Sequence, residues 1–141
     1  MTVTTNRQSE WWALQGRPLC VSDLAVLPLR NAFLGTEYLY VAEFASGWVK
    51  VGRTGDPRTR LQSHARSGTA VAPAGSMERC WVSRLTKPNS RAIEKRLINV
   101  GTEMCSGRYR REYFDGCSFA GLVEAGTRLA DVEVVDEAVS A

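Results

Sequence analysis

The chain has 141 residues, of which 44% are hydrophobic and 23% are charged. This length and composition fit one globular domain with a single core, and they exclude a disordered chain. No apolar stretch approaches the roughly 18 residues that a membrane-spanning helix needs, and the polar N-terminus lacks the apolar core of a signal peptide. We therefore expect a cytoplasmic protein that does not act in the membrane.

Charge is unevenly distributed along the chain, whose net charge is +3. Residues 37–116 contain fourteen basic and eight acidic residues, a net of +6, whereas residues 117–141 contain one basic and five acidic residues, a net of −4. A basic central segment attracts polyanions such as nucleic acid. A solvated basic face explains the same charge equally well, so the composition leaves both interpretations open.

The cysteines Cys20, Cys80, Cys105 and Cys117 are scattered singly, and His64 is the only histidine. A structural zinc site normally takes four ligands from closely spaced pairs. We therefore expect buried, reduced thiols and no structural zinc site.

The segment before residue 37 predicts little regular structure. Residues 9–15, SEWWALQ, fit a short helix, and prolines interrupt residues 17–36, where we expect irregular chain or a second short helix. We treat residues 1–36 as an N-terminal extension. It is available to cover the core, to take part in base recognition or to form a homodimer interface.

Residues 38–53 predict a β-hairpin. YLYVAEF, residues 38–44, is aromatic and β-branched without a breaker, and WVKVGR, residues 48–53, returns after the tight turn ASG. A helix follows, because Asp56 can cap it and Pro57 can occupy its first turn without losing a needed N–H. We expect this helix to run to about Arg66.

The remaining chain predicts one more strand and two helices. Residues 77–85 alternate as a third strand, and residues 88–100 form a helix whose apolar residues recur at i, i+4 and i+7. Residues 108–116 fit a short edge strand or turn, and residues 117–129 fit a last helix. An acidic tail ends the sequence.

This order of elements predicts an α+β fold, with a small three-stranded antiparallel sheet flanked by helices. We expect the N-terminal extension to be followed by a catalytic or binding domain at residues 37–116. A C-terminal helix and the acidic tail occupy residues 117–141.

Cationic side chains gather at the end of the predicted hairpin. Arg60 and His64 are four residues apart, so they share one face of the helix. Gly52 ends the predicted strand, and because it has no Cβ we expect another backbone to approach it closely. Together with Lys50 and Arg53, these residues predict a corner that binds phosphate.

Glu94 lies beside the buried stripe of the helix at residues 88–100. A carboxylate at the edge of a core that faces cations is either a Mg²⁺ ligand or a salt-bridge partner. In isolation, a helical glutamate is most often a surface residue.

Taken in order, these residues resemble the GIY-YIG nuclease superfamily, in the phage and bacterial branch whose second motif is KIG-like. The resemblance covers residues 38–114. The matching positions are, in chain order, Tyr40 in YLY, Gly52 in KVG, Arg60, His64, Glu94 in AIEKRLI and Phe114 in REYF. No single motif is specific, and the ordered set carries the resemblance.

The resemblance implies a metal-dependent endonuclease that hydrolyses phosphodiester bonds in DNA, most simply double-stranded DNA. It implies that Glu94 binds Mg²⁺ or Mn²⁺ and that Arg60 stabilises the negative charge of the transition state. Tyr40 would activate or orient the attacking water, directly or through His64. Lys50, which stands where the standard motif has a second tyrosine, can supply the positive field that a phenol needs to act as a base.

Several arginines are candidates for contacts with the nucleic-acid backbone. They are Arg53, Arg58, Arg108, Arg110 and Arg111. The last three can equally serve to protect an exposed sheet edge from pairing with another chain.

Two departures from the motif keep other hypotheses open: Tyr38 replaces the glycine of GIY, and Lys50 replaces the tyrosine of YIG. The alternative is a nucleic-acid-binding or regulatory module on the same fold that cuts nothing. A third hypothesis is a small anionic substrate, since fold does not determine function. The nuclease hypothesis requires Tyr40, Arg60 and Glu94 to converge on one hollow.

Overall fold

The structure is a computed structural model that describes residues 17–29, 37–66, 76–85, 90–109 and 113–140. The helix expected at residues 9–15 lies outside these described residues. Arg110, Arg111 and residues 67–75, which follow the helix predicted to end at about Arg66, also lie outside the described residues.

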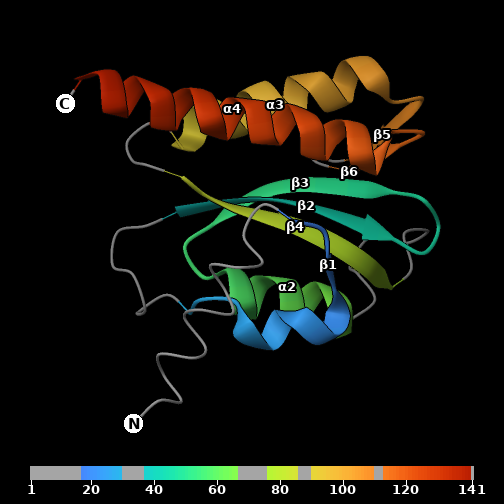
Figure 1. The fold of residues 1–141 in the computed structure, drawn as a ribbon. Helices are drawn as coiled ribbons and strands as arrows, with labels where there is room; N and C mark the ends of the chain where they lie inside the picture. The colour runs from blue at the N-terminus through green and yellow to red at the C-terminus, as the bar shows by residue number, and fades with distance from the viewer. Residues whose placement is uncertain (1–16, 30–36, 67–75, 86–89, 110–112, 141) are drawn as a thin grey trace, which may run out of the picture.

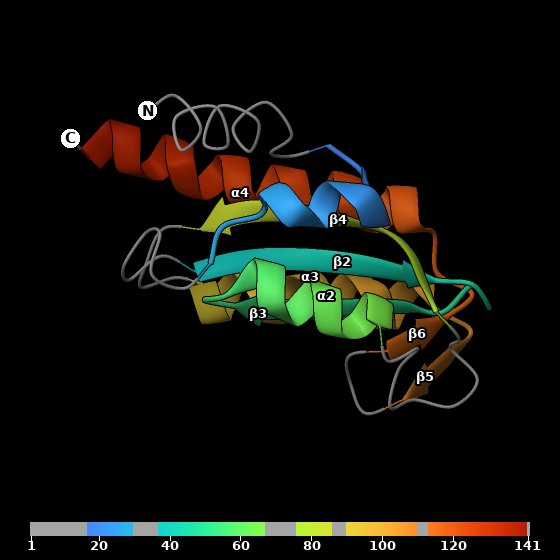
Figure 2. The same ribbon diagram turned by 90° about the horizontal axis from the view of Figure 1, so that it is seen from below.

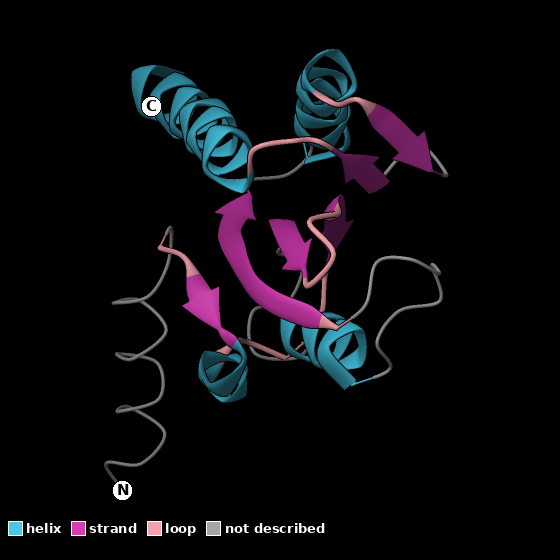
Figure 3. Ribbon diagram, turned by 90° about the vertical axis from the view of Figure 1, so that its right-hand side faces the viewer, coloured by secondary structure: helices cyan, strands magenta, loops and turns pink. Residues whose placement is uncertain are grey.

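The described chain forms one antiparallel sheet between two layers of helices (Figures 1 and 3). Its strands are β1 (Leu19–Cys20), β2 (Glu37–Phe44), β3 (Val49–Thr54), β4 (Met77–Leu85), β5 (Gly107–Tyr109) and β6 (Tyr113–Asp115), in the order β1-β4-β2-β3-β6-β5. The helices are the 3-10 helix η1 (Val21–Val26), α2 (Pro57–Arg66), α3 (Ser90–Met104) and α4 (Phe119–Ser140). The predicted α+β class is confirmed.

The three predicted strands form the centre of the sheet. The β2–β3 hairpin closes through a turn in which Gly47 has a φ of 93°, a backbone conformation that glycine adopts without strain. β4 pairs with the other side of β2. The sheet is wider than predicted because β1, β5 and β6 extend it at its two sides. β6 and most of β5 lie within residues 108–116, for which the sequence predicts a short edge strand or turn, whereas the two-residue β1 is too short to show a period in the sequence.

Helix α2 begins at its predicted cap and ends at Arg66 as expected, whereas α3 and α4 end later than expected. The Asp56 carboxylate accepts a hydrogen bond from the backbone N–H of Thr59 at 3.3 Å, which is the predicted cap of α2. α3 continues to Met104 and α4 to Ser140. The sequence after residue 129 contains no glycine or proline to stop α4. None of the helices in the described ranges is long and apolar enough to cross a membrane.

α3 and α4 cover one face of the sheet, which we call the α3 face, and η1 and α2 lie side by side on the other, the α2 face (Figures 1 and 2). Each face has its own apolar core. Strand β2 contributes to both, because alternate residues point to opposite sides. Tyr38 and Tyr40 join the core with Leu61 of α2, whereas Leu39 and Val41 join the core of the α3 face.

Candidate active site

Tyr40 and His64 meet on the α2 face of the sheet. The Tyr40 hydroxyl lies 3.2 Å from His64 Nε2, within hydrogen-bond distance. The Tyr40 side chain is only 1% exposed, and the edge of Phe44 packs against the imidazole with ring centroids 6.1 Å apart. Packing therefore holds the phenol and the imidazole in an arrangement that allows a proton to pass between them.

Gly52 makes room for the Tyr40 phenol. It lies directly opposite Tyr40 in the β2–β3 register, and a Cβ at this position would overlap the phenol carbon and hydroxyl of Tyr40. The glycine of the KVG motif is therefore required for the position of the tyrosine hydroxyl, and a larger side chain would displace it.

Lys50 places a positive charge beside Tyr40. Its Nζ lies 5.7 Å from the centroid of the Tyr40 ring and 5.1 Å from that of Tyr113, its partner in the β3–β6 register. Both distances are in the range of cation–π contacts. Because Lys50 is only 6% exposed, water screens its charge less than that of a surface lysine.

A hollow of about 290 Å³ opens beside this pair at the start of α2. Its described lining consists of Thr54, Asp56, Thr59, Arg60, Ser63 and His64. Arg60 is exposed there, and His64 connects the hollow to the Tyr40 hydroxyl. A guanidinium and an imidazole in one accessible hollow can form hydrogen bonds with a phosphate oxygen.

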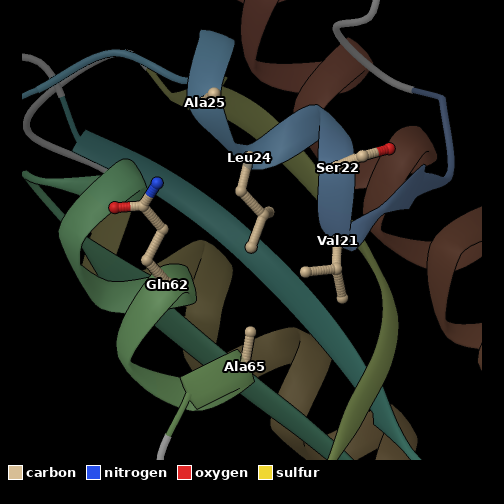
Figure 4. Close-up of a pocket in the computed structure, with 6 residues that line it drawn as sticks. All are labelled: Val21, Ser22, Leu24, Ala25, Gln62 and Ala65. Atoms are coloured by element: carbon tan, nitrogen blue, oxygen red, sulfur yellow. The ribbon is translucent and has the colours of Figure 1, made fainter.

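A larger hollow of about 490 Å³ lies between η1 and α2 (Figure 4). The described residues that line it are uncharged: Val21, Ser22, Leu24, Ala25, Gln62 and Ala65. Because this described lining includes no cation, it offers a phosphate no charged partner, whereas the smaller hollow offers Arg60.

Glu94 lies on the α3 face, beside Arg53 of β3. Arg53 Nε is 3.4 Å from Glu94 Oε1, and Arg53 also forms a closer ion pair with Glu37 of β2. The Ser90 hydroxyl donates a hydrogen bond to Glu37 at 3.3 Å. Burial acts to lower the pKa of Arg53, but the hydrogen bond and charge of Glu37, followed by those of Glu94, outweigh it and raise this pKa.

The two groups of residues occupy opposite faces of one strand end. Gly52 and Arg53 are consecutive, so Gly52 faces Tyr40 while Arg53 faces Glu94. The structure brings Tyr40, Lys50 and His64 together and places Arg60 in the adjoining hollow. Glu94 is not among the described residues that line this hollow. The expected convergence of Tyr40, Arg60 and Glu94 on one hollow is therefore not found, because Arg60 and Glu94 lie on opposite faces of the sheet.

The outer edge of β3 connects the two faces. In the described chain, β6 pairs with Val49 and Lys50, and no strand pairs with the outer side of β3 from Val51 to Thr54. This open edge lies between the helix layer that carries Arg60 and the helix layer that carries Glu94.

Glu94 fits a metal site in which the protein supplies only one or two carboxylates. No group of three or more potential metal-ligating side chains (His, Cys, Asp or Glu) occurs among the residues that the structure describes. Mg²⁺ commonly takes only one or two protein carboxylates and completes its coordination with water and substrate phosphate oxygens. Glu94 is 20% exposed and has Glu37 nearby, on the same arginine. Glu94 is therefore the residue that would hold Mg²⁺ or Mn²⁺, in a site that Arg53 now shares.

The predicted backbone-binding arginines have different surroundings. Arg58 Nε donates to the carbonyl oxygen of Leu27 at 2.7 Å, so this side chain ties α2 to the segment after η1. Arg53 is held in ion pairs. Arg108 lies on β5, opposite Phe114 of β6, and Arg110 and Arg111 fall outside the described residues.

The sequence did not point to Glu37 or Tyr113. Glu37 is the first residue of β2, and its contact with Arg53 depends on strand pairing and side-chain packing. Tyr113 belongs to the REYF segment, so the resemblance already contained a signal for it. Its proximity to Lys50 follows from the β3–β6 register.

This site on a small antiparallel sheet indicates a nuclease-like or DNA-binding domain. The family model of the T5orf172 domain matches residues 37–141, about three quarters of the chain. The chain belongs to the T5orf172 domain family, a nuclease-like family related to the GIY-YIG proteins. No match was found among the curated proteins or the solved structures. The family supports a nucleic acid as the partner.

Proposed function

We propose that this protein is a GIY-YIG-type endonuclease that hydrolyses phosphodiester bonds in double-stranded DNA with Mg²⁺ or Mn²⁺ as its metal. The observation that carries the proposal is the contact between the Tyr40 hydroxyl and His64 Nε2 beside the hollow that Arg60 lines. The basic segment at residues 37–116, with a net charge of +6, supplies attraction for the DNA backbone.

Tyr40 and His64 handle the proton of the attacking water. The phenol accepts this proton as its own proton passes to His64 Nε2, which lies 3.2 Å away. The Lys50 ammonium, near the Tyr40 ring, favours the negative charge that develops on the phenol oxygen.

Arg60 binds the scissile phosphate from the α2 face. Its planar guanidinium can donate to two phosphate oxygens at once, and it stays ionised at every physiological pH. The charge on these oxygens grows as the water attacks, so Arg60 stabilises the transition state more than the bound substrate.

Glu94, with Glu37 nearby, would hold the metal on the α3 face. When bound, the metal offsets negative charge on the phosphate and polarises the bond to the leaving oxygen. Because Arg60 and Glu94 approach from opposite faces, the proposal places the scissile phosphate at the open edge of β3.

The test is cleavage of supercoiled plasmid with Mg²⁺ or Mn²⁺, with linear duplex, single-stranded DNA and RNA as comparison substrates. We expect the wild type to nick or linearise the plasmid. We expect Glu94→Gln to lose activity by about a hundredfold or more, because the metal loses its anionic ligand. The matched control is Glu124→Gln, which removes an exposed carboxylate of α4 from its ion pair with Arg128 and is expected to cleave as the wild type does.

Equal cleavage by the wild type and Glu94→Gln would contradict the proposal, as would no cleavage of any substrate by the wild type. If the protein cuts nothing but binds duplex DNA equally with and without Glu94, and binding weakens steeply with salt, the non-catalytic module replaces the nuclease.

A further inference from the structure

Arg53 forms an ion pair with the Glu94 carboxylate, to which the proposed function assigns the metal. The Arg53 guanidinium contacts Glu94 at 3.4 Å and Glu37 at a shorter distance, and it lies between β2 and α3. Both carboxylates are therefore neutralised in part by one cation. A divalent metal on Glu94 and a guanidinium on the same oxygen would repel each other at short range.

We propose that Arg53 is an internal counter-ion that leaves Glu94 when the metal binds, and that the released guanidinium then binds a phosphate of the DNA. This inference rests on the proposed function, because it takes Glu94 as the metal ligand. It makes Arg53 a positioning residue that couples metal binding to DNA binding.

The two contacts of Arg53 differ in a way that favours this exchange. The pair with Glu37 is the closer one, and Ser90 holds the Glu37 carboxylate in place with a hydrogen bond. The pair with Glu94 is longer, so it is the weaker contact. Arg53 can therefore give up Glu94 while it keeps Glu37, without leaving a partly buried charge unpaired.

Arg53 is also placed to reach a phosphate. Its side chain is 24% exposed, and Arg53 belongs to the part of β3, Val51 to Thr54, whose outer side no described strand pairs and to which the proposed function assigns the scissile phosphate. A guanidinium has five N–H donors in a planar fork, and the contacts to Glu37 and Glu94 use Nη1 and Nε. The donors that remain can bind a phosphate while the pair with Glu37 persists.

Thermodynamic linkage requires that the metal and the DNA change each other's affinity by the same factor. DNA that draws Arg53 away leaves Glu94 with its full negative charge, which raises the affinity for the metal. The metal that displaces Arg53 frees a cation for the DNA and raises the affinity for DNA by the same factor.

The first experiment measures Mn²⁺ binding to the full chain without DNA, by isothermal titration calorimetry or electron paramagnetic resonance. We expect Arg53→Gln to bind Mn²⁺ about two- to tenfold more tightly than the wild type, because a partly exposed competing ion pair has been removed. Arg79→Gln is the matched control, since Arg79 pairs at 2.5 Å with Glu43 of the same strand β2, toward its opposite end. We expect this control to bind Mn²⁺ as the wild type does.

The second experiment measures binding of a fluorescent duplex by anisotropy, with Ca²⁺ as the divalent cation and without it. We expect Ca²⁺ to tighten DNA binding by the wild type. In Arg53→Gln we expect weaker DNA binding and a smaller effect of Ca²⁺, because the coupling residue is gone. Arg53→Lys keeps the charge without the planar fork, so its Mn²⁺ affinity is expected between those of the wild type and Arg53→Gln.

The outcomes separate the two proposals. If Arg53→Gln and Arg53→Lys bind Mn²⁺ no more tightly than the wild type while Glu94→Gln loses Mn²⁺ binding, the counter-ion inference fails and the nuclease proposal stands. If Glu94→Gln binds Mn²⁺ as the wild type does, the proposed function itself fails. Circular dichroism melting of each variant verifies that it is folded, and Arg53→Lys, which keeps the positive charge but not the two nitrogens that contact Glu37 and Glu94, carries the test if Arg53→Gln unfolds.

Discussion

A buried phenol, its histidine partner and a lysine between aromatic rings define the site at the level of single residues. Tyr40 is held by His64 from α2, by Gly52 from β3 and by the Lys50 charge beside it. A small change in any of these neighbours moves the phenol relative to the hollow. Such constellations lose activity with displacements of about 1 Å.

Gly52→Ala tests this dependence. The added Cβ would overlap the Tyr40 phenol, so we expect the ring to shift away from His64 and DNA cleavage to fall by at least about tenfold. Overpacking should also lower the free energy of unfolding by about 1–3 kcal/mol. Urea unfolding and plasmid cleavage measure both effects.

The control for this variant is Gly107→Ala on β5. A Cβ there would meet the Asp115 side chain at 3.4 Å, an ordinary contact distance. We expect it to remain close to the wild type in stability and cleavage. Wild-type behaviour of Gly52→Ala would show that Tyr40 does not need the space that Gly52 leaves.

Helix α2 is the element that decides whether the site forms, since it carries both Arg60 and His64. Its first turn is held by the Asp56 carboxylate, which accepts from the N–H of Thr59, and by the hydrogen bond from the N–H of Asp56 to the Thr54 hydroxyl. Arg58 then anchors the helix to the carbonyl of Leu27. The start of α2 thus fixes the wall of the hollow.

Asp56→Ala removes the helix cap. We expect the free energy of unfolding to fall by about 0.5–2 kcal/mol. We also expect cleavage to weaken, because Arg60 lies in the turn that frays. Asp56→Asn retains a capping oxygen and should stay close to the wild type in chemical denaturation. Equal destabilisation by Ala and Asn would contradict the capping role and point to the charge of Asp56 instead.

The whole molecule consists of two apolar cores separated by one sheet. Because titratable groups are buried in these cores, we expect the free energy of unfolding to fall at alkaline pH. Burial, followed by the charges of Asp23 and Cys20, raises the pKa of the Cys80 thiol from 9.0 to about 12. Burial likewise raises the pKa of the Tyr38 hydroxyl to about 12, and the charge of Arg84 opposes this only in part. In the unfolded chain, both groups release their protons at a lower pH than in the folded chain.

The sign of the pH dependence follows from these shifts. Below pH 9 the Cys80 thiol is protonated in both states, and its contribution to stability is complete. Between pH 9 and 12 the unfolded chain loses this proton before the folded one, so the free energy of unfolding falls as pH rises. Tyr38 steepens the fall above pH 10. Each group contributes a slope of at most about 1.4 kcal/mol per pH unit.

Urea unfolding in reducing buffer at pH 8 to 11 measures this loss. We expect Cys80→Ala to flatten the decline relative to the wild type. A decline as steep in Cys80→Ala as in the wild type would refute the assignment to Cys80.

Short-range chemistry allowed much of the fold to be predicted from the sequence. The hairpin at residues 38–53, the cap at Asp56 and the periodic helix that carries Glu94 depend on neighbours within a few residues, and all three are present. The T5orf172 match supports the nuclease-like class that the ordered motifs suggested.

Only the tertiary structure decided which side chains meet. Strand alternation puts Gly52 and Arg53 on opposite faces, but the face that α3 covers depends on how this helix packs against the sheet. That packing places Glu94 beside Arg53 and away from the lining of the Arg60 hollow. The pairing of Arg53 with Glu37, sixteen residues earlier, likewise arises from packing between elements. Contacts between elements leave no periodic signal in a single sequence, because they depend on the three-dimensional path of the chain.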